Sequence, residues 1–136
     1  MDISQIQKQK IEEIAEKYCL KLVLLFGSQA DDKTHKESDF DVAYLSKKNL
    51  DFNEKSYLNF EFTNVFRHNR VDTIDMQKAS PLLLYAVFQR PVILYAKDSL
   101  IFFAYRIYAF KKYIETKPLY EEKFKRLKEK ISKIKK

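Results

Sequence analysis

Residues 20–42 of the chain read LKLVLLFGSQADDKTHKESDFDV, and this stretch decides the fold. The apolar run over 20–26 is short and stops at Gly27, which favours a buried strand over a helix. The polar residues 31–37 predict a loop, and Phe40 to Leu45 predict a second strand. Gly27 is the only glycine in the chain. We therefore expect its backbone to need either a positive φ or close approach to a ligand.

Polar residues at the two ends of that loop form a pattern: Gly27-Ser28, ten residues, then Asp39-Phe40-Asp41. Alternate side chains of a strand share a face, so Asp39 and Asp41 are expected to point the same way. Two adjacent carboxylates repel each other unless a cation lies between them, and Mg²⁺ is the usual cation beside phosphates. A Gly-Ser turn that opens a helical turn offers free N–H groups to a phosphate. The pattern predicts a magnesium-dependent site for a nucleoside triphosphate.

The rest of the chain alternates helical and strand patterns. Apolar residues recur at helical spacing from Ile3 to Tyr18, which predicts an amphipathic helix. Further along we expect a helix over 53–67, a strand over 71–76, a helix from Ser80-Pro81 to near Pro91, and a strand over 92–95. This order predicts an α+β fold: a small mixed β-sheet with flanking helices and a helical C-terminal extension.

A long helix is expected from Asp98 or Ser99 onward, with Pro118 kinking or breaking it. Aromatic residues crowd its first half, over 102–113, in larger number than one buried stripe can use. Either a second contact surface or a two-sided core would account for them. The stripe that we expect to be buried consists of Phe103, Ile107, Phe110 and Ile114.

Length and charge suggest how the chain is organised. Its 136 residues suit one globular domain, in which we distinguish a core over 1–97 from a helical extension over 98–136 that packs on the core and is available to a partner. The extension carries the charge: residues 111–136 hold 11 Lys/Arg and 4 Asp/Glu, whereas residues 1–110 hold 15 of each. Such a helix could meet nucleic acid, but a solvated basic face is the simpler interpretation. Because no apolar run approaches the roughly 20 residues of a membrane span and no signal-peptide pattern occurs, we expect a cytoplasmic protein.

The motif Gly27-Ser28-x10-Asp39-Phe40-Asp41 resembles the signature of the DNA polymerase β-type nucleotidyltransferase superfamily. The similarity continues through RVDTIDM at 70–76, ASPLL at 79–83 and VILY at 92–95, and into the helix around 117–122. Within the superfamily, this order resembles the minimal nucleotidyltransferase (MNT) proteins, the antitoxin half of HEPN/MNT toxin–antitoxin modules. The resemblance implies a polymerase β-like fold, with residues 1–97 as the nucleotidyltransferase core, and ATP as the nucleotide donor. It also implies a cognate HEPN ribonuclease toxin as the partner in a hetero-oligomer, silenced by AMP transfer to one of its tyrosines.

In this family a third carboxylate, on a later strand, completes the metal site. Asp72 and Asp75 both lie in the 71–76 strand, and their opposite parity places them on opposite faces. The family's ligand directly follows the first apolar residue of the strand, which matches Asp72 and leaves Asp75 as a turn or cap residue. The implied mechanism has Asp39 and Asp41 bridging two Mg²⁺ ions about 3.5–4 Å apart. Asp72 would be a ligand and general base, and Gly27-Ser28 would bind the nucleotide.

One departure from the family pattern keeps other functions open. Where many members carry Arg and Gly, this chain has Asp31-Asp32, and acidic residues near a triphosphate disfavour its binding. The same fold could therefore act as an antitoxin by binding alone. A nucleotidyltransferase acting on a small molecule or on RNA is a third hypothesis, although such enzymes of this superfamily usually carry an extra substrate domain.

Overall fold

The computed structural model describes residues 3–27, 40–67 and 70–134, which contain four strands and four helices. The strand order is β3-β2-β1-β4, with β1 antiparallel to both its neighbours and β3 parallel to β2. A mixed sheet with flanking helices is the predicted α+β fold, which is therefore confirmed. In chain order the elements are α1 (Gln5–Lys17), β1 (Leu20–Phe26), β2 (Phe40–Ser46), α2 (Phe52–Phe66), β3 (Val71–Asp75), α3 (Pro81–Val87), β4 (Val92–Ala96) and α4 (Ser99–Ile134).

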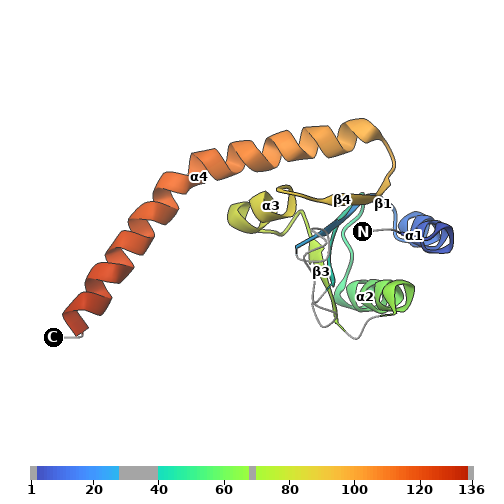
Figure 1. Cartoon of the computed structure of the whole chain (residues 1–136), viewed down its shortest axis with the longest axis horizontal. Coiled ribbons are helices and arrows are strands. Elements are labelled where there is room, and N and C mark those ends of the chain that lie inside the picture. Colours follow the sequence, from blue (N-terminus) through green and yellow to red (C-terminus); the bar gives the residue numbers. More distant parts are fainter. Residues whose placement is uncertain (1–2, 28–39, 68–69, 135–136) are drawn as a thin grey trace.

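Helices cover both faces of the sheet, as Figure 1 shows, with α1 and α2 on one side and α3 and the first part of α4 on the other. On the first side Leu58 and Phe62 of α2 are fully buried, and on the second side Phe88 and Phe102 pack together. Each fully buried side chain of this size contributes roughly 1.5–3 kcal/mol. Because both faces are covered, the central strand β1 is apolar at almost every position, and the prediction of a buried strand is confirmed.

Local signals in the sequence set where the helices begin. Ser4 and Asp51 each form a capping box with the residue three positions later. The Ser80 hydroxyl accepts a hydrogen bond from the Leu83 N–H at 3.2 Å, and Pro81 occupies the first turn, as predicted. These caps satisfy N–H groups that have no partner within the helix, so each helix begins at a defined residue.

The buried stripe predicted for the first half of α4 is wrong. Phe103, Ile107 and Ile114 are 57%, 68% and 69% exposed, and of the predicted set Phe110 alone packs against the core. The face turned toward the sheet and α3 is displaced around the helix. It consists of Ile101, Phe102, Tyr105, Ala109 and Phe110. The buried face includes Ala109 and Tyr105. A prediction based on large apolar side chains alone therefore chose the neighbouring face of the helix.

Pro118 lies inside α4, which continues to Ile134 as one helix that changes direction near its middle (Figure 1). The predicted kink is confirmed and a break is excluded. Proline has no N–H to donate to the preceding turn. In that turn the Thr116 hydroxyl donates to the carbonyl of Lys112 at 2.8 Å, a bond that bends helices. None of the helices in the described ranges carries an apolar stretch suited to spanning a lipid bilayer.

Candidate active site

Three predicted site residues, Gly27, Asp41 and Asp72, lie at one edge of the sheet, where β1 ends and β2 and β3 begin. We call this region the carboxylate edge. Phe26, the last residue of β1, is the antiparallel partner of Asp41, and Asp41 is the parallel partner of Asp72. Neighbouring strands lie about 4.8 Å apart, and directly paired residues project from the same face. Asp41 is half-buried and Asp72 is exposed, so the two carboxylates stand side by side at a boundary with solvent.

Gly27 is required here for two reasons. Its φ of +80° lies in the region that side-chain-bearing residues rarely adopt. A Cβ atom at this position would also lie 2.6 Å from Asp41 Oδ2, well inside van der Waals contact. The positive φ predicted from the solitary glycine is confirmed. The close approach is made to the Asp41 carboxylate, so the turn after β1 fixes the position of that side chain.

Asp75 lies on the other face of β3, as its parity predicts, and pairs with Tyr44 in the register. Its carboxylate forms an ion pair with Lys55 Nζ at 3.4 Å and accepts a hydrogen bond from the Gln77 N–H at 3.0 Å. Burial and then the charge of Asp75 raise the pKa of Tyr44 to about 12. Asp75 therefore acts as a turn and packing residue, and the carboxylate that the register places beside Asp41 belongs to Asp72.

Two further predicted site residues, Ser28 and Asp39, lie outside the described residues, so their roles stay predictions. Within the described ranges, no group of three or more His, Cys, Asp or Glu side chains is placed to hold a metal. The chemistry of the donors nevertheless suits a hard divalent cation. Asp41 and Asp72 provide carboxylate oxygens from adjacent strands, the ligands that Mg²⁺ prefers.

Two arginines that sequence reasoning missed lie at the same edge. The Phe40 N–H donates to the carbonyl of Arg70 at 3.0 Å, which places Arg70 directly beside the start of β2. Val92 is the partner of Leu25, so the segment containing Arg90 reaches this edge as well. Both arginines are exposed. No local sequence pattern indicates that Arg90 lies here, because the long-range pairing of β4 with β1 brings it to this edge.

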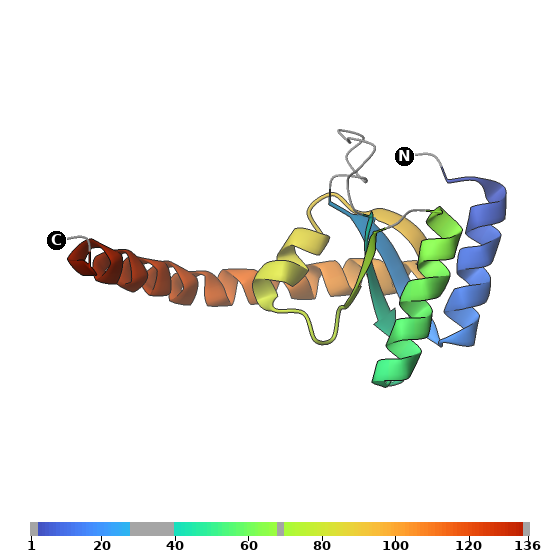
Figure 2. The ribbon, with the colours of Figure 1, turned by 90° about the horizontal axis from the view of Figure 1, so that it is seen from below.

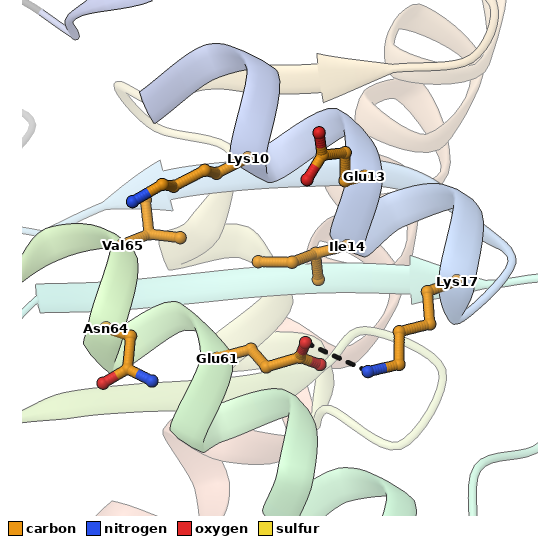
Figure 3. Close-up of a pocket in the computed structure, with 7 residues that line it drawn as sticks. All are labelled: Lys10, Glu13, Ile14, Lys17, Glu61, Asn64 and Val65. Atoms are coloured by element: carbon orange, nitrogen blue, oxygen red, sulfur yellow. Dashed lines mark hydrogen bonds and ion pairs between the residues drawn. The ribbon is translucent and has the colours of Figure 1, made fainter. Parts of the chain in front are cut away.

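A cleft of about 380 Å³ between α1 and α2 is a second candidate site (Figure 3). It lies on the side of the sheet opposite to the face of Asp41, since Val42 and Tyr44 contact α1 and α2. Figure 3 shows Lys17 and Glu61 paired across it, with Nζ and Oε1 3.1 Å apart. The lining carries two lysines and two glutamates, so its charges balance, and the predicted motif residues lie elsewhere.

The mixed sheet, with a glycine turn and paired aspartates at one edge, agrees with the class of protein that the sequence resemblance predicts, the nucleotidyltransferases. The sequence model of the family described as polymerase beta, nucleotidyltransferase matches residues 9–100. The chain belongs to this family. The matched segment includes Gly27, Asp41 and Asp72 and ends at the start of α4. No curated protein matches the chain in a sequence search.

Solved structures share this fold along most of the chain. A chain from the crystal structure of a toxin–antitoxin with AMP-PNP superposes with a TM-score of 0.71 at 22% identity, covering 86% of this chain and 98% of that one. A chain from a tri-AMPylated Shewanella oneidensis HEPN toxin in complex with an MNT antitoxin gives 0.67 at 21% identity, covering 88% and 98%. A third, from the toxin–antitoxin MntA-HepT, gives 0.67 at 20% identity, covering 89% and 99%.

Proposed function

We propose that this chain is a cytoplasmic antitoxin that transfers AMP from ATP to a tyrosine of a HEPN ribonuclease toxin and so silences it. The observation that carries the proposal is the pairing of Asp41 with Asp72 beside the Gly27 turn. Family membership supports nucleotide transfer as the reaction. The similar structures are toxin–antitoxin complexes, one with AMP-PNP and one with an AMPylated toxin, and they support the donor and the acceptor.

Asp41 and Asp72, together with Asp39, would hold two Mg²⁺ ions. Such ions supply charge neutralisation on the triphosphate and make the acceptor hydroxyl more acidic. Ser28 and the turn at Gly27 would contact phosphate through N–H and hydroxyl groups. Arg70 and Arg90 add positive charge at the same edge, which attracts the triphosphate and favours its binding.

The protein's own groups have two tasks in the transfer. Asp72, exposed at the edge, takes the proton from the tyrosine hydroxyl while the tyrosine oxygen forms a bond to the α-phosphorus of ATP. The bond from that phosphorus to the bridging oxygen breaks, and pyrophosphate leaves with the electron pair. Asp41, fixed against Gly27, holds its carboxylate at the reacting end of the triphosphate. The products are AMP–tyrosine on the toxin and free pyrophosphate.

The test is incubation of the chain with ATP labelled at the α-phosphate, Mg²⁺ and the purified product of the adjacent gene, which we expect to be a HEPN protein. Label should appear on the toxin and disappear in Asp41→Ala and Asp72→Asn. Asp75→Asn is the matched control, because that residue lies on the same strand with its carboxylate paired to Lys55. A tight complex without label transfer would mean that the chain neutralises by binding alone. Label on RNA or a small molecule would assign it to another branch of the family.

A further inference from the structure

The last part of α4, residues 119–134 and here called the tail, extends beyond the sheet and its flanking helices in both views (Figures 1 and 2). Residues 121–134 are all exposed. A helix of this length is marginal by itself in water, and helices that persist generally bury an apolar face. The tail has such a face, and within the described part of the chain nothing covers it, since Phe124, Leu127 and Ile134 are 57%, 51% and 82% exposed.

The apolar residues of the tail follow a heptad pattern. Tyr120, Phe124, Leu127, Ile131 and Ile134 recur at intervals of four, three, four and three residues. This spacing produces one narrow row, the seam by which a helix packs along another helix. A helix that lies in a membrane interface would instead need a broad apolar face. The row therefore fits a helical protein surface.

Charged residues line both flanks of this seam. In the heptad, Lys123 and Lys130 occupy the g position, and Glu121 and Lys128 occupy the e positions, all directly beside the seam. Glu122 and Glu129 occupy the f position on the opposite side, where Glu122 pairs with Arg126 at 2.8 Å. The flanks that would face a partner helix thus carry mainly positive charge. Two copies of the tail would bring lysines together across the seam, which disfavours self-association.

We propose that the tail docks along its seam onto a helix of the HEPN toxin that is apolar at the facing positions and acidic beside them. This proposal rests on the proposed function for the identity of the partner. The docking surface is separate from the carboxylate edge. Bound through the tail, the toxin is held at high effective concentration near the reacting groups. Loss of docking therefore raises the KM for toxin and leaves the KM for ATP unchanged.

The decisive experiment compares two double charge reversals that change the net charge equally. Lys123→Glu/Lys130→Glu alters both g positions, whereas Lys125→Glu/Lys133→Glu alters b and c positions on the outer side of the same helix. Binding to the purified HEPN protein is measured by titration in an Asp41→Ala background, so that no AMP transfer occurs. We expect the first pair to weaken binding at least tenfold and the second by less than twofold. Leu127→Gln, within the seam, should weaken binding as well.

Several outcomes would overturn this assignment. Equal weakening by both pairs would mean that net charge alone matters, as for nucleic acid. Unchanged affinity in both pairs, dimerisation of the chain alone through the tail, or stronger binding to vesicles of phosphatidylserine and phosphatidylcholine would each exclude toxin docking. Failure of the proposed chemistry appears differently: the unmodified tail still binds the toxin with the expected g-position dependence, but no label is transferred. Far-UV circular dichroism and thermal unfolding confirm that both pairs keep the fold.

Discussion

The carboxylate edge and the tail occupy different parts of the molecule and are built in opposite ways. At the edge, strand pairing fixes Phe26, Asp41 and Asp72 beside one another. Asp41 Oδ2 is so close to Gly27 that no Cβ would fit between them. Along the tail, a row of large apolar side chains is exposed on a single helix. Chemistry requires groups held within fractions of an ångström, whereas docking requires area and charge that a partner can cover. The two proposals accordingly assign catalysis to the edge and recognition of the toxin to the tail.

Asp41→Ala tests that division with the largest expected effect. Removing a carboxylate that would bind the metal should lower AMP transfer on the order of 10⁴-fold. Toxin affinity should stay within about twofold, because the tail is unchanged. Transfer is followed with labelled ATP and affinity by titration. A parallel loss of both would show that the edge itself is part of the docking surface.

Two phenylalanines of α4 compare the regions in stability. Phe102 is 7% exposed and packs against Phe88, with ring centroids 5.7 Å apart, whereas Phe124 is 57% exposed. Phe102→Ala should lower the free energy of unfolding by roughly 3–5 kcal/mol, and Phe124→Ala by less than about 0.5 kcal/mol. Urea unfolding of the free chain measures both. A large cost at Phe124 would mean that the tail packs on the core in solution.

The sequence predicted those parts of the structure that depend on local pattern. Strand β1, the cap at Ser80 and the positive φ of Gly27 follow from runs, caps and a solitary glycine. The buried face of α4 did not follow, because large apolar residues surround that helix and only tertiary packing decides which of them meet the sheet. Arg90 was missed for the same reason, since a long-range strand pairing brings it to the edge. Asp72 as the third carboxylate stays a prediction: the register places Asp72, and not Asp75, beside Asp41, and only an activity measurement can assign its role.

The raised pKa of Tyr44 makes the free energy of unfolding depend on pH. Its folded-state pKa of about 12 lies above the ordinary value of 10.0, because burial and the charge of Asp75 disfavour the phenolate. The resulting stabilisation is fully present below pH 10 and is lost as the pH rises toward 12, by roughly 3 kcal/mol in total. Tyr44→Phe should therefore lose less stability than the wild type over that range. Urea unfolding monitored by circular dichroism at pH 9 and pH 12 measures the difference.

Gly27→Ala tests how tightly the edge is fixed. The positive φ should cost about 1–2 kcal/mol of stability, and the added methyl group must displace the Asp41 carboxylate. AMP transfer should fall more than stability alone explains, while toxin binding is retained. Thermal unfolding and the transfer assay are run on the same preparation. If transfer is unaffected, the contact between Gly27 and Asp41 does not position the carboxylate.

Asp75→Asn has the smallest expected effect and tests whether Asp72 or Asp75 is the third carboxylate. Its ion pair with Lys55 is partly exposed, with 28% and 13% of the two side chains accessible, so its loss should cost about 1 kcal/mol or less. Transfer should stay within about twofold of the wild type, because Asp75 faces away from Asp41. Asp72→Asn, three residues earlier on the same strand, should abolish it. If Asp75→Asn abolished transfer and Asp72→Asn did not, the reacting face of the sheet would be the one that carries Tyr44. Asp75 would then be the third carboxylate in place of Asp72.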